Sequence, residues 1–462
     1  MALALRAENP AAWPHYRYED LLALDRTERE ALQLAALRLR FQGLRDKVPA
    51  LGKLASKQGV DGIERIADVL PLCFDHRVLK NYPLSILESR DLPKLTAWLN
   101  KLTAHDLTRV DLRGLKTIDQ WLDRLTEFGM IIGTSSGTTG KLSFVPRSRD
   151  EWAAWRAAYL DVNRAATGVD SNTTKLPSFF PGYRCGHQMM LKIIYQFAPD
   201  MTGGLENYHT LYDGSMPSDL MALSGRLQAA EEKGEIHRLG LDPALLEQRQ
   251  RMIEQGRHKA QDMEEWFGKL IEQYRGKRVK IGGPFSELYR VAKSGMDKGQ
   301  RCSFAPDSIL IGGGGMKGYK DAPDNWEDII KEFFGIDRFA SMYGFSECIG
   351  TAPLCRHDYF HFMPYTLPML LDTDGNELPR EGVHKGRLAV FDLLAESYWG
   401  GFISGDEVTM HWDERCECGW GGPRIEKSIR RYSEMEGGDD KITCAGSAQA
   451  YNEFMSFVME GQ

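Results

Sequence analysis

The chain has 462 residues, of which 65 are acidic and 58 basic, and its formal net charge is −7. With 42% hydrophobic and 27% charged residues, its composition is that of an ordinary globular protein, which excludes disordered, collagen-like and coiled-coil proteins. The acidic balance also argues against a nucleic-acid partner, because proteins that bind nucleic acids usually carry a basic excess.

Signals for a membrane or secreted protein are missing from the sequence. No run approaches the roughly 18 apolar residues that a membrane span needs. The first residues lack the basic region and apolar stretch of a secretory signal. Eight cysteines in a chain of this length are too few for a disulfide scaffold. We therefore expect a reduced, cytoplasmic protein, and the sequence leaves its oligomeric state open.

Residues 1–128 are predicted to be mainly helical. Leucine and alanine recur at helical spacing in residues 30–41, and similar patterns occur in residues 95–102 and 118–128. Charged residues lie between the apolar positions, so these helices should each pack one face against other parts of the protein.

The character of the chain changes at Met130. Short β-type runs alternate from there with glycine-rich turns and helices, which is typical of a parallel α/β sheet flanked by helices. Such sheets bind ligands at the carboxyl ends of their strands. The charged residues 201–275 predict a helical insertion, whereas the runs at 386–394 and 401–412 predict a smaller antiparallel β region.

The densest group of chemistry-bearing residues is GTSSGTTGK at 133–141, directly after an apolar run. Glycines let backbone N–H groups approach a phosphate, and hydroxyls and an ammonium add further donors. The segment is not a Walker A loop, which would have glycine at Ser135 and a hydroxyl residue at Leu142. Rather than an ordinary turn, we predict a phosphate-binding loop of Ser135, Ser136, Gly137, Thr138, Thr139, Gly140 and Lys141.

This loop resembles the phosphate loop of the adenylate-forming superfamily, which includes acyl-CoA synthetases, luciferases and nonribosomal adenylation domains. Four further segments resemble motifs of that superfamily and follow in the same order. They are GGGGMK at 312–317, YGFSE at 343–347, Gly405-Asp406, and DDKI at 439–442. The matches extend over about two thirds of the chain, which makes a chance agreement a poor explanation.

The resemblance implies a role for each matching residue. Lys141 and Glu347 would be catalytic, and Glu347 would hold magnesium, which prefers hard carboxylate oxygen. Asp406 would accept hydrogen bonds from the ribose, with Arg430 or its neighbour Arg431 beside it. The remaining nucleotide-binding residues, around the adenine, would be Gly313, Gly314, Gly315, Met316, Lys317, Tyr343, Gly344 and Ser346.

A second group of residues has the composition of a metal site. Cys355, His361, Cys416 and Cys418 supply three thiolates and an imidazole, the ligands of a closed tetrahedral structural zinc site. Their order resembles the zinc element of the phenylacetate–CoA ligase branch of the superfamily. Cys348 or His357 could take the place of one of them, and the alternative interpretation is four unconnected buried residues.

The glycine turn and the segment NYPLS at 81–85 also resemble the acyl-protein synthetases of bacterial luminescence. Those proteins transfer the acyl group to a protein thiol, whereas phenylacetate–CoA ligase transfers it to coenzyme A. The resemblance therefore leaves the acceptor open between coenzyme A, which we favour, and a protein thiol or an amine.

The fold implied is α/β, a large N-terminal adenylate-forming domain with parallel sheets flanked by helices and a smaller antiparallel region. Residues 1–128 would be its helical start, 129–438 its core, and 439–462 a hinge and the beginning of a C-terminal domain that is largely missing. The activity implied is the activation of a small carboxylic acid, aromatic or acyl, by ATP and Mg²⁺. It yields an acyl-adenylate and pyrophosphate, and the acyl group then passes to the acceptor. A nucleotide- or acid-binding module without turnover is the alternative of another class.

The acid pocket is expected between residues 178–198 and the glycine turns. Two glycines before Pro284 and Phe285 indicate the close approach of a flat ligand. The candidate lining residues are Phe179, Phe180, Tyr183, His187 and Phe285.

Overall fold

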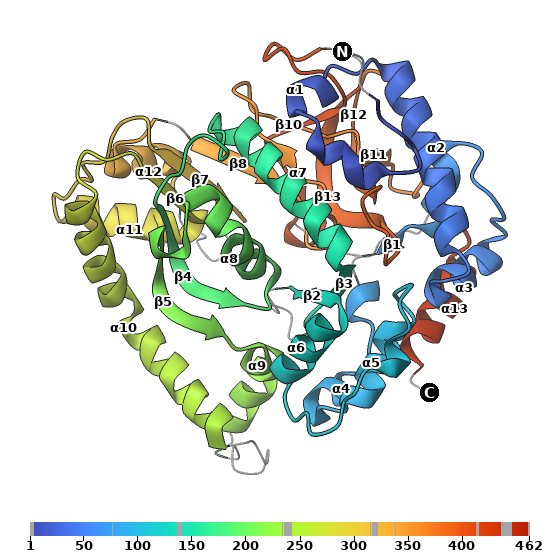
Figure 1. Cartoon of the computed structure of the whole chain (residues 1–462), viewed down its shortest axis with the longest axis horizontal. Coiled ribbons are helices and arrows are strands. Elements are labelled where there is room, and N and C mark those ends of the chain that lie inside the picture. The colour runs from blue at the N-terminus through green and yellow to red at the C-terminus, as the bar shows by residue number, and fades with distance from the viewer. Residues whose placement is uncertain are drawn as a thin grey trace. The chain divides into compact units, whose positions relative to one another are not determined.

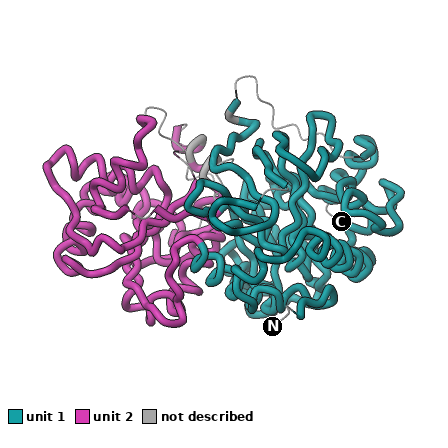
Figure 2. The backbone as a smooth tube through the Cα atoms, turned by 90° about the horizontal axis from the view of Figure 1, so that it is seen from above, with its two compact units in different colours: residues 1–165, 343–462 teal, residues 166–342 magenta. Residues whose placement is uncertain are grey.

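The computed structural model describes residues 4–75, 77–135, 141–232, 234, 243–314, 316, 322–337, 339–412, 415–435 and 446–460. The chain forms two compact units, residues 1–165 with 343–462, and residues 166–342 (Figure 2). The first unit is therefore built from both ends of the chain. Within the described residues, no helix is both long and apolar enough to cross a membrane.

The second unit is built on a parallel sheet (Figure 1). Every strand pair in the order β5-β4-β6-β7-β8 is parallel, as the alternation of strands and helices predicts. The strands are β4 (Ser178–Gly186), β5 (Tyr208–Met216), β6 (Lys280–Pro284), β7 (Ile309–Gly313) and β8 (Phe339–Tyr343). The helices are α8 (Met189–Thr202), α9 (Ser218–Glu232), α10 (Pro243–Gln273), α11 (Phe285–Asp297) and α12 (Trp326–Phe334).

Both faces of this sheet are buried. Leu310 of β7 belongs to a core cluster with residues of α10, α11 and α12, such as Phe334. Its neighbours Ile309 and Ile311 point to the opposite face and join a second cluster. A strand buried on both faces consists almost entirely of apolar residues, which explains the continuous run SILI in the sequence.

Residues 201–275 contain a strand, so the prediction of a purely helical insertion was wrong there. β5 pairs in parallel with β4 at the edge of the sheet. Tyr208 and Thr210 are buried and alternate with the half-buried His209 and Leu211, as in a strand with one covered face. This short aromatic and β-branched run is followed by the charged helices α9 and α10, whose composition dominates the segment.

The first unit combines an antiparallel sheet with helices. The sheet has the order β10-β14-β13-β12-β11, and two short strands, β1 and β15, also pair with β13. Its strands are β1 (Phe74–Asp75), β10 (Tyr359–His361), β11 (Thr366–Leu371), β12 (Val383–Asp392), β13 (Gly401–His411), β14 (Arg424–Glu426) and β15 (Arg430–Arg431). The antiparallel pairing of β12 with β13 confirms the prediction for residues 386–394 and 401–412.

The remaining strands of the first unit are short. β2 (Met130–Thr134) and β3 (Phe144–Ser148) form an antiparallel hairpin, and β9 (Ala352–Pro353) lies further along the chain. The helices are α1 (Tyr18–Leu21), α2 (Arg26–Leu44), α3 (Pro49–Gln58), α4 (Leu84–Ser89), α5 (Leu92–Asn100), α6 (Ile118–Phe128), α7 (Arg149–Thr167) and α13 (Ala448–Met459).

The helix ends explain why the N-terminal predictions are correct. The Thr117 hydroxyl accepts a hydrogen bond from the Gln120 N–H at the start of α6, and Gly129, with φ 105°, ends the helix. Asp25 caps α2 in the same way through the Glu28 N–H. The predicted helices 30–41 and 118–128 therefore lie within α2 and coincide with α6.

The last described residues pack on the helical start of the chain. Phe454 of α13 stacks on Phe74 with ring centroids 5.3 Å apart. The Tyr451 hydroxyl accepts a hydrogen bond of 2.7 Å from the Asp75 N–H. Residues 446–460 are thus part of the first unit, where burial of one helix face stabilises a segment too short to fold alone.

Candidate active site

The predicted phosphate loop connects the two strands of the β2–β3 hairpin. At its base, the Ser135 N–H donates to the Ser143 carbonyl over 3.3 Å, and the Ser143 N–H donates to the Ser135 hydroxyl over 3.0 Å. Ser136, Gly137, Thr138, Thr139 and Gly140 lie outside the described residues. The structure therefore defines the two ends of the loop, at Ser135 and Lys141.

Lys141 is held by a segment that precedes α4. Its ammonium donates to the Tyr82 carbonyl over 2.8 Å and lies 5.4 Å from the centre of the Tyr82 ring. The Tyr82 hydroxyl donates in turn to the Leu142 carbonyl over 2.8 Å. Burial and the nearby Lys80 ammonium lower the pKa of Lys141. Residues 80–82 thus belong to the site, although the sequence singled out 81–85 only for its resemblance to another branch.

Buried side chains fix the backbone of the YGFSE segment. The Arg147 guanidinium donates to the Ser346 carbonyl and the Tyr398 hydroxyl donates to the Glu347 carbonyl, both over 2.7 Å. Arg147 and Tyr398 are almost completely inaccessible to solvent. A Cβ atom on Gly344 would lie 2.6 Å from the Thr351 side chain, so this position requires glycine.

Glu347 carries a buried carboxyl group, 9% exposed. Burial raises its pKa, whereas the positive charges of Arg147, Lys80 and Arg431 oppose that rise. The Glu347 carboxylate accepts a hydrogen bond from its own backbone N–H, and no ion pair or side-chain hydrogen bond reaches it from another residue that the structure describes. It is therefore a carboxylate in a positive environment that has room for one further ligand, such as a cation or its water.

Asp406 is brought to the site by an irregularity in β13. Glu407 faces Arg387 and Ile403 faces Ala389, so three residues of β13 oppose the single Leu388. Such a bulge bends the strand and redirects its side chains. The Tyr343 hydroxyl donates to the redirected carboxylate of Asp406 over 2.8 Å.

The two candidate arginines lie on β15, beside β13. Arg431 faces Asp406 in the strand register, and its Nε lies 3.5 Å from Asp406 Oδ1. Arg430 instead forms an ion pair with Glu407. The structure thus places Arg431, and not the predicted Arg430, beside Asp406. Neighbouring residues of a strand point in opposite directions, which separates the two side chains.

Tyr343 has an apolar environment on one side of its ring. Its centroid lies 5.8 Å from that of Phe360 and 6.5 Å from that of Phe362. Burial, and then the Asp406 carboxylate, raise the pKa of Tyr343 well above its ordinary value, so the hydroxyl remains a donor at neutral pH. The ring itself is half-buried, and Ser346 is half-buried as well.

The predicted adenine turn belongs to the second unit, after β7. A Cβ atom on Gly313 or Gly314 would meet no other atom within 4 Å, and Gly314 has φ +80°. Met316 is half-buried against the core of this unit. Gly315 and Lys317 lie outside the described residues.

Two of the residues predicted to line the acid pocket are core residues instead. Phe179 and Phe285 belong to the same buried cluster, and the Phe285 ring stacks on that of Phe339 with centroids 4.9 Å apart. A Cβ atom on Gly312 would lie 1.9 Å from the Phe285 ring, and one on Gly283 would lie 3.0 Å from Pro181. Gly312 therefore makes room for the Phe285 ring and Gly283 lies against Pro181, whereas the close approach of a flat ligand to Gly282 and Gly283 stays a prediction.

The other candidates for this pocket are half-buried or paired. Phe180 and Tyr183 are half-buried, and the Tyr183 hydroxyl donates to Gln255 over 2.7 Å. His187 and Lys192 are buried at the end of β4, with the Lys192 ammonium 3.0 Å from His187 Nδ1. Their part in substrate binding stays a prediction.

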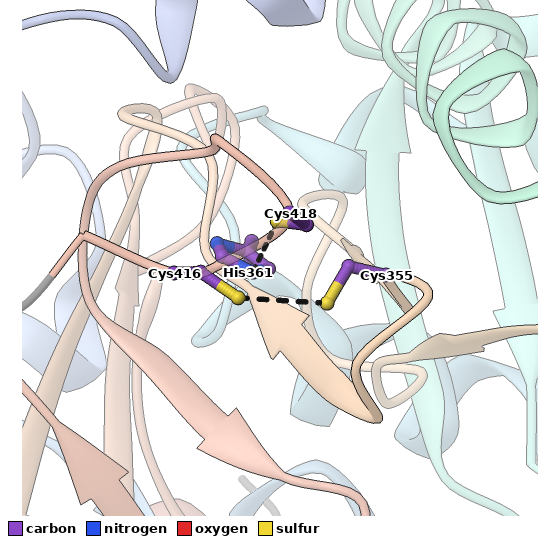
Figure 3. Close-up of side chains that lie close together, drawn as sticks. All are labelled: Cys355, His361, Cys416 and Cys418. Carbon is purple, nitrogen blue, oxygen red and sulfur yellow. Dashed lines mark hydrogen bonds between the residues drawn. The ribbon is translucent and has the colours of Figure 1, made fainter.

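Four potential metal ligands lie together in the first unit (Figure 3). The ligating atoms of Cys355, His361, Cys416 and Cys418 all lie within 4.8 Å of one another. Neither Cys348 nor His357, the open alternatives, belongs to this group. The interpretation as four unconnected buried residues was therefore wrong, because the pairing of β10 with β14 brings the two halves of the group together.

The distances within the group match those of a tetrahedral zinc site. Cys355 Sγ lies 3.9 Å from Cys416 Sγ, and Cys418 Sγ lies 3.6 Å from His361 Nε2. Bonds of about 2.3 Å to sulfur and 2.0 Å to nitrogen would separate these atom pairs by roughly 3.8 and 3.5 Å. Burial lowers the pKa of His361 to about 4, so the imidazole is neutral, as a metal ligand must be.

The loops around these residues supply further support. The Trp420 N–H donates to Cys418 Sγ and the His357 N–H to Cys355 Sγ, both over 3.4 Å, contacts that a metal-bound thiolate would also accept. His361 Nδ1 lies 3.4 Å from the Gly421 carbonyl, which leaves Nε2 directed at the group. The four side chains fit a structural metal ion.

Comparison with known proteins identifies the fold. No known family matches the sequence, and no curated protein matches it either. A 2-hydroxyisobutyryl-CoA ligase in complex with 2-HIB-AMP and CoA superposes on 89% of this chain and 72% of its own, with 12% identity and a TM-score of 0.51. The same ligase in its thioesterification state matches 88% of this chain and 69% of its own length, with 14% identity and a TM-score of 0.50. This similarity shows that the chain shares the α/β fold of these ligase structures.

Proposed function

We propose that the protein is an AMP-forming ligase that activates a small carboxylic acid with ATP. The observation that carries this proposal is a group of charged side chains in the first unit that interact with one another. The Lys80 ammonium interacts electrostatically with the Lys141 ammonium and with the Glu347 carboxylate. Arg431 also interacts with Glu347 and forms an ion pair with Asp406. Lys141, Glu347 and Asp406 come from segments that resemble three separate motifs of one superfamily, and they occur on a fold shared with known AMP-forming ligases.

These charged side chains could bind the phosphates and the ribose of a nucleoside triphosphate. Lys141 and the hydroxyls and N–H groups of residues 135–140 would bind the phosphates. Asp406 and Arg431 would hold the ribose, and Tyr343 would position Asp406 through its hydroxyl. For Gly313, Gly314 and Met316, which belong to the second unit, contact with the adenine stays a prediction of the resemblance. Glu347 would hold Mg²⁺, which when bound neutralises phosphate charge and orients the phosphates.

The reaction is a substitution at the α-phosphorus. A carboxylate oxygen of the acid forms a bond to this phosphorus, and the bond to the oxygen that bridges to the β-phosphate breaks. Pyrophosphate leaves with that electron pair, and the acyl-adenylate remains. The residues of the site accelerate this step by positioning the two reactants and by neutralising charge on the leaving group.

For the second step we propose coenzyme A as the acceptor. Its thiolate would attack the acyl carbon and AMP would leave. The resemblance to acyl-protein synthetases makes a protein thiol the second candidate, and an amine is the third. The 2-hydroxyisobutyryl-CoA ligase structures that share the fold contain CoA, which supports the first.

For the cysteine–histidine group we propose a structural zinc ion. Three sulfurs and one nitrogen complete a tetrahedron, so no position remains for a substrate or for water. The ion would hold β10 and the segment after β13 together. This group also supports a place for the protein near the phenylacetate–CoA ligase branch.

The test of the function is acid-dependent exchange of labelled pyrophosphate into ATP, measured over a panel of aryl, hydroxy and fatty acids. Exchange with one class of acid supports adenylation and identifies the substrate class. ATP binding without exchange for any acid would support the binding module instead, and release of γ-phosphate would point to a kinase or NTPase. A protein that binds no ATP contradicts the proposal.

A further inference from the structure

Lys80 lies in a short segment that is tied to the phosphate loop. It ends the 3-10 helix Val78–Lys80, and hydrogen bonds fix the next two residues. The Asn81 carbonyl accepts from the Trp98 indole over 3.0 Å, and the Asn81 side-chain amide donates to the Met455 carbonyl over 2.8 Å. The Tyr82 carbonyl accepts from the Lys141 ammonium, and the Tyr82 hydroxyl donates to the Leu142 carbonyl, both over 2.8 Å. The backbone at Lys80 is therefore held against the last residues of the loop.

The charge of Lys80 is not matched by an acidic partner. Lys80 is half-buried, and in the part of the chain that the structure describes it makes neither an ion pair nor a side-chain hydrogen bond. Its positive charge lowers the pKa of the Lys141 ammonium and opposes the rise in the pKa of the Glu347 carboxyl group. The Lys80 ammonium is thus close enough to interact with a second ammonium group and with one carboxylate.

Such an arrangement has a cost that a bound anion removes. Like charges at short range repel one another, and partial burial weakens their screening by water. Lys80 and Lys141 carry two positive charges and Glu347 one negative charge, because Arg147 also interacts with Asp392 and Arg431 is shared with Asp406. A polyphosphate carries the missing negative charge and offers acceptors for both ammonium groups.

We propose that Lys80 is a second phosphate-binding cation of the site, which with Lys141 holds the pyrophosphate portion of ATP. This inference rests on the proposed function and adds a residue that none of the matching motifs contains. As the bond to the α-phosphorus breaks, negative charge grows on pyrophosphate, and the Lys80 ammonium would stabilise it there. The lysine would therefore act on binding of ATP and pyrophosphate and on the rate of their exchange.

The test compares three variants with the wild-type protein. Lys80→Met removes the charge and keeps the apolar chain, Lys80→Arg keeps the charge, and Lys47→Met removes an exposed lysine elsewhere in the same unit. Isothermal titration calorimetry with Mg·ATP, pyrophosphate, AMP and adenosine measures each Kd. Thermal unfolding of each variant is recorded in parallel.

We expect K80M to raise the Kd of ATP and of pyrophosphate by about tenfold or more, the loss typical of a hydrogen bond to a charged group. The Kd of AMP and of adenosine should stay within about twofold, because those ligands lack the β- and γ-phosphates. K80R should recover most of the affinity for ATP. K47M should behave as the wild type with all four ligands.

Other outcomes overturn the assignment. If K80M binds ATP and pyrophosphate like the wild type, Lys80 has no such role, although the proposed function stands. If K80M weakens adenosine as much as ATP and lowers Tm, Lys80 supports the fold only. If K47M shows the same loss as K80M, the effect is one of overall charge. A wild-type protein that binds no ATP overturns the proposed function together with this inference.

Discussion

Arg430 and Arg431 are neighbours in β15, yet they meet different acidic residues. Arg431 lies beside Asp406, whereas Arg430 pairs with Glu407, which also pairs with Lys385. Arg430 therefore belongs to a separate group of charges around Glu407 that does not include Asp406. Arg431 is the arginine that can reach a ligand held by Asp406.

This difference predicts unequal effects of two single substitutions. Arg431→Ala should raise the Kd of ATP by about tenfold, because it removes a charged hydrogen-bond donor next to the ribose. Arg430→Ala is the matched control and should change the Kd by less than about twofold. Titration calorimetry with Mg·ATP measures both values. An equal loss in the two variants, or a loss in R430A alone, would contradict the assignment.

At the scale of elements, the cysteine–histidine group joins parts of the sheet that are far apart in sequence. Cys355 precedes the turn into β10, His361 is the last residue of β10, and Cys416 and Cys418 follow β13. The strands β10 and β14, which pair here, have three residues each. A metal ion would supply the stability that such short strands cannot provide.

Replacement of a ligand should therefore release the metal and weaken this region. Cys418→Ser is expected to lower the zinc content from one ion per chain to near zero and to lower Tm by about 5 °C or more. Cys185→Ser, a half-buried cysteine of the second unit, is the matched control and should keep both values. Elemental analysis by mass spectrometry and thermal unfolding measure them. A wild-type protein without zinc after expression in zinc-supplemented medium rules out the metal.

At the scale of the whole molecule, the first unit is held together by buried carboxylates that accept backbone hydrogen bonds. Asp392, at the end of β12, accepts from the N–H groups of Ile349 and, over 3.0 Å, Leu394. Glu151 of α7 accepts from the Ser148 and Ser397 N–H groups in the same manner, over 2.6 and 2.8 Å. These bonds connect the chain after Glu347 with the β12–β13 connection, so the position of the site depends on them.

Asp392 makes stability depend on pH in a direction that can be tested. Burial raises its pKa to about 6 from an ordinary value of 3.8. The folded protein therefore binds more protons than the unfolded chain between these pH values. This contribution is complete below pH 3.8 and is lost as the pH rises through 6.

The Asp392→Asn variant lacks this titration. We subtract the free energy of unfolding of D392N from that of the wild type. As the pH rises from 4 to 6.5, this difference should fall by up to roughly 3 kcal/mol. Urea unfolding at several pH values measures both free energies, and Asp372→Asn, at an exposed turn, is the control. A difference that rises with pH, or stays constant, would contradict the raised pKa of Asp392.

Local patterns predicted a large part of this structure. The helix of residues 118–128 has a capping threonine at one end and a glycine at the other, and both act within a few residues of the helix. The parallel sheet follows from apolar runs that alternate with helices, and the candidate metal ligands were found from residue type and order. Each of these features depends on neighbours in the sequence or on the chemistry of one side chain.

The errors come from contacts between distant segments. β5 is a strand because it pairs with β4, and the composition around it did not show this. Phe285 was expected to line the acid pocket, whereas its ring belongs to the core and fills the space beside Gly312. A glycine admits a ligand and a side chain equally well, so only the packing distinguishes the two.

The sequence by itself determined the order of the motifs, the types of secondary structure and the chemical character of the residues that would bind a nucleotide and a metal. Tertiary structure alone decided which of two adjacent arginines faces Asp406 and that Lys80 lies beside Lys141. The physical reason is that strand register and a bulge in β13 direct side chains to one face or the other. Charge interactions then depend on distances in space, which the spacing of residues along the chain does not specify.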